Sequence, residues 1–88
     1  MDKTKIPHKP GVYIYKDQAG KILYVGKAID LYHRVSSYFS ASHTESGKLT
    51  SLVREIRDIE TIIVESELEA LILEANLIKK YSPPFNIR

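Results

Sequence analysis

The sequence contains no cysteine among its 88 residues. Disulfide bonds and thiolate metal sites are therefore excluded, and a reducing compartment is compatible with the composition. The amino-terminal segment, MDKTKIPHKP, lacks the apolar stretch that signal peptides contain. No apolar run approaches the roughly 20 residues that a membrane-spanning helix needs, so we expect a cytoplasmic chain that does not enter a membrane.

An excess of charge of one sign is also missing. The formal net charge is only +2, too small to predict nucleic-acid binding by itself. The positive residues nevertheless gather in KIPHK, GKAIDLYHR and KKYSPPFNIR, whereas EIRDIE and ESELE carry most of the acids. This distribution predicts one basic face on a molecule that is nearly neutral overall.

The composition is that of a soluble globular protein, with 43% apolar and 27% charged residues. A chain of 88 residues is too short for two independent cores, so we expect residues 1–88 to form one domain. A single layer of helices on one sheet is the most that we expect this length to support. We also expect a monomer.

The stretch GVYIYKDQAGKILYVG, residues 11–26, predicts a β-hairpin. Its first strand, Val12–Lys16, is rich in β-branched and aromatic residues and follows a proline and a glycine. Asp17 and Gly20 suit the tight connection between strands. ILYV forms the second strand, which we expect Gly26 to end. Side-chain alternation brings the tyrosines of the two strands together, although a bulge at Gly20 would shift the register.

Two amphipathic helices follow the hairpin. Asp30 is a plausible N-cap for a helix to about Phe39, whose buried stripe is Leu31, Val35 and Tyr38. Residues 40–48 form a polar link. A second helix, ending near Asp58, then buries Leu49, Leu52, Val53 and Ile56.

The remaining segments predict a third strand and a third helix. ETIIVE, residues 60–65, is a short strand that we expect to be buried on both faces and to join the hairpin in a three-stranded antiparallel sheet. Ser66 and Glu69 form a capping box that opens a helix over residues 67–81, and SPP ends it. The fold class is therefore α+β, in the order β-β-α-α-β-α.

Within the last helix, Glu74 stands among apolar residues. Its neighbours three and four positions away are Ala70, Leu71, Leu77 and Ile78. A partly buried carboxylate costs several kcal/mol to leave unpaired, so it needs a cation, a hydrogen-bond network or a protonated state. A cation would be either a side chain, namely Lys27, Arg34 or Lys79, or a hard divalent ion such as Mg²⁺. Because no second acid stands at a ligand spacing, water and substrate would complete the ion's shell.

The two hairpin tyrosines also have two readings. Tyrosine is common on strands because it packs well, and packing alone would account for Tyr13 and Tyr24. The residues that follow favour a phosphate site, because Gly26 would let a phosphate approach the backbone and Lys27 and Arg34 could bind it.

Further residues are ambiguous from the sequence alone. His33 is a surface residue, a phosphate contact or a proton carrier. Tyr38 belongs either to the core or, through its hydroxyl, to the same cleft. Asn86, in PPFN, is by default a turn residue.

Taken together, GVY at 11–13 and YVG at 24–26 resemble the two motifs that name the GIY-YIG nuclease superfamily. PGVYIYKD, LYVGKAIDLYHRVSSYF and LEALILEANLIKKYSPPFNIR are similar, in the same order, to segments of the N-terminal nuclease domain of the UvrC family of bacterial excinucleases. This resemblance covers nearly the whole chain. It implies the GIY-YIG fold and the cleavage of one DNA strand, on the 3′ side of a lesion in nucleotide excision repair.

The resemblance also implies roles for individual residues. The catalytic set comprises Tyr13, Tyr24, Lys27, Arg34, Tyr38 and Glu74. Glu74 is the acid that binds one Mg²⁺ or Mn²⁺ ion. We expect substrate contacts from Lys27, His33, Arg34 and Asn86, and also from Gly26 by the phosphate reading given above. We expect a tyrosine to take a proton from the attacking water, with Tyr24 favoured over Tyr13, and Lys27 and the metal to favour its phenolate.

Two other functions are compatible with the sequence. One is a noncatalytic DNA-binding module, whose binding would depend strongly on salt and which would cut no DNA. The other is a stand-alone GIY-YIG nuclease. The sequence ends at Arg88, soon after Asn86, as expected of a fragment of a longer protein or a small independent one. In the fragment case, the damage-recognition proteins of the excision nuclease would be partners through other domains.

Overall fold

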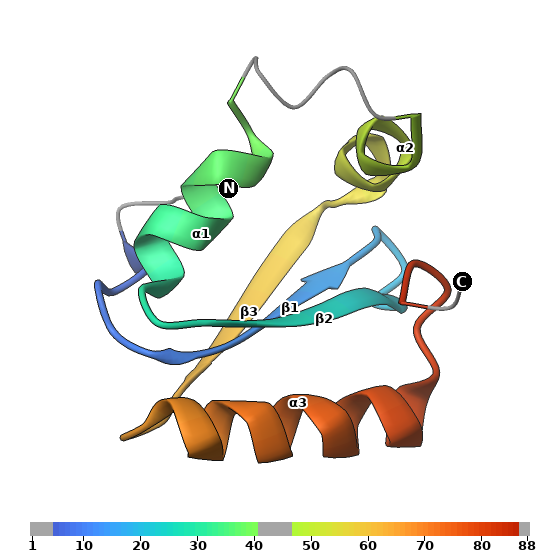
Figure 1. The fold of residues 1–88 in the computed structure, drawn as a ribbon. Helices are drawn as coiled ribbons and strands as arrows, with labels where there is room; N and C mark the ends of the chain where they lie inside the picture. Colours follow the sequence, from blue (N-terminus) through green and yellow to red (C-terminus); the bar gives the residue numbers. More distant parts are fainter. Residues whose placement is uncertain (1–4, 41–46, 87–88) are drawn as a thin grey trace.

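The computed structural model describes residues 5–40 and 47–86. Six elements follow the predicted order (Figure 1), namely β1 (Gly11–Lys16), β2 (Ile22–Ala28), α1 (Leu31–Tyr38), α2 (Gly47–Glu55), β3 (Asp58–Ile63) and α3 (Glu67–Tyr81). Most of the predicted polar link, residues 41–46, lies outside the described residues. Within the described part of the chain, no helix is long and apolar enough to cross a membrane.

The three strands form one antiparallel sheet in the order β2-β1-β3. The predicted three-stranded antiparallel sheet is thereby confirmed. The expected burial of the third strand on both faces is wrong, because β3 lies at an edge and its residues are exposed or half-buried. Ile63, at its end, is 54% exposed. The central, fully covered strand is β1 instead.

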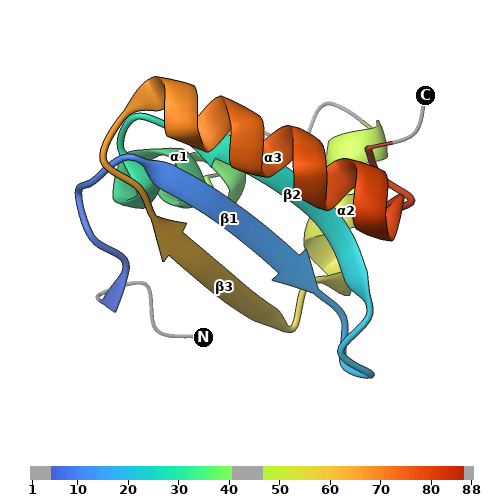
Figure 2. The ribbon, with the colours of Figure 1, turned by 90° about the horizontal axis from the view of Figure 1, so that it is seen from below.

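Helices cover both faces of the sheet. Figure 1 shows α1 and α2 on one side and α3 on the other, and Figure 2 shows α3 running across β1 and β2. The expectation of a single helical layer is therefore wrong. Its physical reason lies in β1, where Val12 and Ile14 face α3 while Tyr13 and Tyr15 face the opposite core. Since both faces of this strand are apolar, each needs its own cover.

Strand β2 is longer than predicted, because it continues through Gly26 to Ala28. Gly26 does not end the strand but pairs with Tyr13 of β1. A Cβ atom at this position would overlap the ring and hydroxyl of Tyr13. The glycine is therefore required inside the strand by the close approach of a large side chain.

A bulge lies in β2 rather than at Gly20. Tyr15 pairs with Tyr24 and Lys16 pairs with Ile22, so Leu23 is the additional residue. Leu23 and Tyr24 consequently pack on the same side of the sheet. The turn itself forms as predicted, with the carboxylate of Asp17 accepting two backbone hydrogen bonds and with a left-handed glycine at Gly20, φ 85°.

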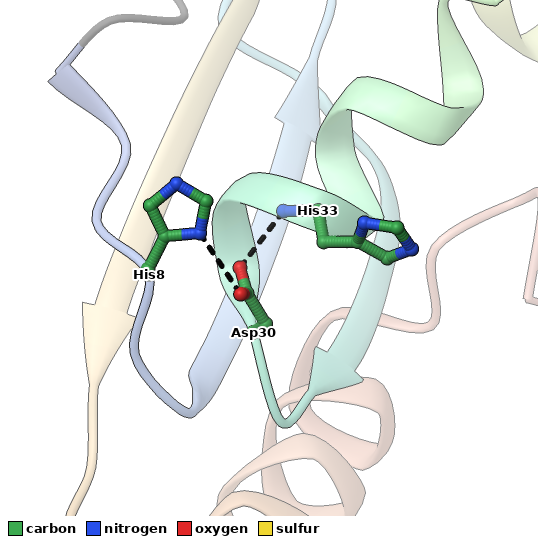
Figure 3. A network of polar contacts seen from close by, with 3 residues as sticks. All are labelled: His8, Asp30 and His33. Carbon is green, nitrogen blue, oxygen red and sulfur yellow. Dashed lines mark hydrogen bonds and ion pairs between the residues drawn. The ribbon is translucent and has the colours of Figure 1, made fainter.

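The N-terminal end of α1 is capped as predicted. The Asp30 carboxylate accepts a hydrogen bond of 2.9 Å from the backbone N–H of His33 and contacts Nδ1 of His8 at 2.9 Å (Figure 3). These contacts lower the pKa of Asp30, chiefly through the His33 N–H and then His8. They also join the segment before β1 to the start of α1.

Helix α2 differs from the prediction at both ends, since it begins at Gly47, inside the predicted polar link. Helix α2 ends at Glu55, three residues before the predicted end, because the N–H of Arg57 already donates to Lys16 at 2.8 Å and the chain then enters β3. Helix α3 covers the predicted residues. Its N-terminal cap, Ser66, accepts from the N–H of Glu69 at 3.1 Å, and Ser82 ends it with φ 42°.

Replacing Gly26 by alanine tests the packing of Tyr13 against β2. We expect Gly26→Ala to lower the free energy of unfolding by about 1–3 kcal/mol, because the new methyl group forces Tyr13 out of its position. Urea denaturation followed by circular dichroism measures this loss. Gly20→Asn is the matched control, because asparagine tolerates the left-handed backbone and the described residues leave space around it. Unchanged stability of Gly26→Ala would show that Tyr13 moves aside without cost.

Candidate active site

Four tyrosines gather on the α1 side of the sheet. Their ring centroids lie between 5.1 and 6.3 Å apart, and they are Tyr13 and Tyr15 from β1, Tyr24 from β2 and Tyr38 from the end of α1. Three of them are candidates from the sequence. The fourth, Tyr15, shares the face of Tyr13 by strand alternation, but nothing in the sequence reveals that it pairs with Tyr24 until the bulge is known.

Tyr13 is the most enclosed of the candidate phenols. It is 2% exposed, and its hydroxyl forms a hydrogen bond of 2.9 Å with that of Tyr38. Burial, and then the neighbouring Tyr38, raise the pKa of Tyr13 far above the ordinary value. Tyr13 therefore stays protonated and can act as a hydrogen-bond donor.

Tyr24 is only half-buried, and its phenol is easier to ionise. Burial, followed by Tyr38 and the carboxylate of Glu74, raises the pKa of Tyr24 to about 12. The hydroxyl of Tyr13 acts in the opposite direction and favours the Tyr24 phenolate. The net rise is opposite to the fall that we expected from Lys27, so the groups of the protein alone do not produce a phenolate at neutral pH.

Tyr15 forms the floor of the cluster. Its side chain is fully buried, and within the described part of the chain its hydroxyl has no hydrogen-bond partner. Burial raises the pKa of Tyr15, whereas the charge of Arg34 opposes that rise. The positive charge of Arg34 therefore favours the ionised form of Tyr15, but burial outweighs it.

Glu74 is half-buried on α3, as its apolar neighbours predict. Its negative charge contributes to the raised pKa of Tyr24. The alternative pairing is not observed, since among residues 5–40 and 47–86 no ion pair joins Glu74 to Lys27, Arg34 or Lys79. No described group of three or more histidine, cysteine, aspartate or glutamate residues could hold a metal. The donor set thus fits an ion held by one carboxylate and water, which is a common arrangement for Mg²⁺.

The two basic candidates are exposed and line one hollow of about 510 Å³, which we call the basic hollow. Its lining comprises Lys27, Ala28, Ile29, Arg34, Glu67, Leu68, Ala70 and Leu71. Neither Lys27 nor Arg34 forms an ion pair with a described residue. The structure therefore leaves two cations available for an anion in the basic hollow.

The remaining candidates lie around this group. His33 is exposed and lines a neighbouring hollow with Arg34, and Figure 3 shows its ring directed away from His8. Asn86 is bound to the outer edge of β2, where its side chain accepts from Val25 N–H at 2.9 Å and donates to Val25 C=O at 3.0 Å. Gly26 is buried beneath Tyr13. Asn86 and Gly26 thus contact the strand of Tyr24 and the ring of Tyr13.

Ionisation of the tyrosine cluster gives a test of its burial. The pKa of Tyr24 in the folded protein lies above the ordinary value of 10.0. The contribution of the neutral Tyr24 phenol to folding stability is therefore complete below pH 10 and is lost as the pH rises from 10 toward 12. We expect the urea midpoint to be constant between about pH 7 and 9 and to fall above pH 10. Tyr24→Phe should show a smaller alkaline fall than the wild type. A wild-type midpoint independent of pH up to about 11.5 would contradict the burial of these phenols.

Sequence comparison identifies relatives along nearly the whole chain. Residues 9–87 match the family model of the UvrC-like GIY-YIG domain. The UvrABC system protein C of Gemmatimonas aurantiaca is 56% identical over 82 residues, which are 93% of this chain and 13% of that protein. The protein of the same name from Methanospirillum hungatei is 55% identical over 87 residues, 99% of this chain and 16% of that protein. This chain thus spans less than one fifth of the length of either relative.

Solved structures show the same fold. The GIY-YIG N-terminal endonuclease domain of UvrC from Thermotoga maritima, bound to its catalytic magnesium, superposes with a TM-score of 0.84 at 44% identity. The match covers 97% of this chain and 91% of that one. That domain is also bound to its divalent cation when a tyrosine is replaced by phenylalanine or an asparagine by alanine, with TM-scores of 0.84. By family model, identity and fold, this chain belongs to the UvrC-like GIY-YIG domain family.

Proposed function

We propose that this chain is a divalent-metal-dependent DNA endonuclease domain that hydrolyses a phosphodiester bond, as in the 3′ incision of nucleotide excision repair. The observation that carries the proposal is the half-buried Glu74 carboxylate. Its negative charge raises the pKa of Tyr24, and it has no cationic partner among the described residues. A noncatalytic DNA-binding module would gain nothing from such an acid, because it repels phosphates.

Glu74 would hold one Mg²⁺ or Mn²⁺ ion together with water. When bound, the ion would act as a Lewis acid that polarises the scissile phosphate and stabilises the leaving oxygen. The magnesium-bound Thermotoga maritima domain supports this assignment. Variants of that domain with a tyrosine or an asparagine replaced are still bound to the cation. We therefore infer that the tyrosines and Asn86 of this chain have roles other than holding the ion.

Tyr24 would take the proton of the attacking water at its phenolic oxygen. Its pKa of about 12 is raised, but Tyr13 is more deeply buried and its hydroxyl is already bonded to Tyr38. Tyr13 supports Tyr24 instead, because a hydroxyl beside the phenolate stabilises the ionised form. This comparison favours Tyr24 over Tyr13 as the general base.

The basic residues would bind the DNA backbone. Lys27 and Arg34 are free of described acidic partners, so both can bind phosphate, and Arg34 can offset charge that develops on the phosphoryl oxygens. His33 would add a backbone contact from the hollow next to Arg34. Gly26 and Asn86 would shape the substrate site through Tyr13 and β2.

We extend the proposal to the assembly in which this domain works. Because the relatives are UvrABC system proteins and are several times longer, we infer that other domains bring this chain to damaged DNA in the cytoplasm, beside damage-recognition proteins. The domain itself would be a monomer. A stand-alone nuclease is the alternative. If the isolated chain cuts DNA weakly and the damage-recognition proteins increase its cutting, the domain works in the larger assembly. Efficient cutting by the isolated chain would favour the stand-alone nuclease.

Glu74→Gln tests the metal role. We expect it to reduce Mg²⁺-dependent or Mn²⁺-dependent nicking of plasmid DNA by about 100-fold or more, because glutamine lacks the charge that holds the ion. DNA binding without metal should change by less than about twofold, measured by fluorescence anisotropy. Glu69→Gln, an exposed acid on the same helix, is the control and should nick normally. Full nicking by Glu74→Gln at low Mg²⁺ would refute the proposed site.

Replacing single tyrosines by phenylalanine tests which phenol accepts the proton of the attacking water. Since the pKa of Tyr24 is about 12, its phenolate fraction rises about tenfold per pH unit below that value, and the nicking rate should rise with pH between about 6 and 9. Tyr24→Phe should lower the rate by about 100-fold or more and flatten this dependence. Tyr13→Phe should lower the rate less and keep the slope. A flattened profile in Tyr13→Phe alone would reverse the assignment.

A further inference from the structure

The basic hollow has an apolar floor, and the proposed hydrolysis of the phosphodiester bond assigns no role to these apolar residues. Its apolar residues are Ala28, Ile29, Leu68, Ala70 and Leu71. Three of them are unusually open for large aliphatic side chains, with Ile29 66%, Leu68 64% and Leu71 48% exposed. The volume of about 510 Å³ lies within the range of small-molecule sites, so the hollow can admit a group as large as a nucleoside.

The hollow borders the candidate active site on two elements. On β2, Lys27 directly follows Gly26, over which the phenol of Tyr13 packs. On α3, Ala70 and Leu71 lie one helical turn before Glu74. A phosphate held beside Glu74 and Tyr24 therefore has its neighbouring nucleotide within reach of this hollow.

The chemistry of the lining matches a nucleotide. Lys27 and Arg34 can bind a phosphate, and neither is neutralised by a described acid, while Glu67 is the single acid of this lining. The aliphatic floor offers contact to the flat face of a base, as apolar side chains do around bases that have left the duplex. A partner protein would use the apolar floor but would leave the two cations unexplained unless it were acidic.

We propose that the basic hollow binds the nucleotide next to the scissile phosphate, with its base unstacked and packed against Ile29, Leu68 and Leu71. This inference rests on the proposed nuclease function. It identifies the preferred substrate as a strand that is locally unpaired beside the cleavage point. In a fully paired duplex the same base must first leave the stack, which costs a few kcal/mol.

The test uses three short DNA duplexes and the 88-residue chain without added metal. The first duplex is fully paired, the second has one unpaired nucleotide, and the third has an abasic residue at that position. Fluorescence anisotropy gives the dissociation constants. We expect the unpaired nucleotide to be bound about tenfold more tightly than the paired duplex, and the abasic duplex to lose most of this gain.

Two aliphatic residues on α3 provide matched variants. Leu71 lines the hollow, whereas Ile72 is 53% exposed on the same helix and is absent from the lining. Leu71→Ala should reduce the preference for the unpaired nucleotide by about threefold or more, and Ile72→Ala should preserve it. Circular dichroism of both variants checks that the fold is retained.

The outcomes separate this inference from the proposed function. Equal affinity for all three duplexes, or an equal effect of Leu71→Ala and Ile72→Ala, would overturn the nucleotide site and direct attention to a protein partner on α3. Metal-dependent nicking would remain possible in that case. Conversely, a base preference that depends on Leu71 in a chain that never nicks DNA would refute the nuclease function while keeping the nucleotide site. Failure to bind any of the three duplexes would overturn the nucleotide site, whereas metal-dependent nicking in the presence of the damage-recognition proteins would still support the nuclease function.

Discussion

The packing of Tyr13 over Gly26 is the contact on which the arrangement of the site depends. Tyr13 stands on the central strand, and only a missing side chain on β2 lets its ring cross that strand. In this position the hydroxyl meets Tyr38 at 2.9 Å, which ties the end of α1 to the sheet. Strand, helix and phenols are thus fixed relative to one another by one close approach.

The polar atoms on the two sides of the sheet have different surroundings. On the α1 side, phenols satisfy each other or, as at Tyr15, are buried without a described partner. On α3, Glu74 brings negative charge toward Tyr24, which makes the phenolate harder to form. The Glu74 carboxylate and a Tyr24 phenolate would repel each other, so the ionised pair is poorly stabilised without added positive charge. The arrangement is consistent with a site completed by a cation and an anionic substrate.

The sequence predicts much of this structure because its signals are local. The capping residues Asp30 and Ser66, the turn at Gly20 and the apolar surroundings of Glu74 depend on neighbours within four positions. The order of elements and the hairpin follow from such signals.

What the sequence does not predict depends on contacts between distant segments. The bulge at Leu23, the edge position of β3 and the helical cover on both faces arise only when the strands pair. The same holds for Tyr15, whose partners come from β2 and α1. The direction of the Tyr24 pKa shift also requires the structure, because burial outweighs the charges that the sequence suggests.

The segment after α3 has a consequence for self-association. Strand β2 lies at an edge of the sheet, where unpaired backbone groups can accept a strand from another chain. Phe85 N–H donates to Leu23 at 3.0 Å, and the Asn86 amide occupies both backbone groups of Val25. These bonds act as a short substitute strand that closes this part of the edge beside Tyr24. They therefore protect this part of the domain from edge-to-edge aggregation.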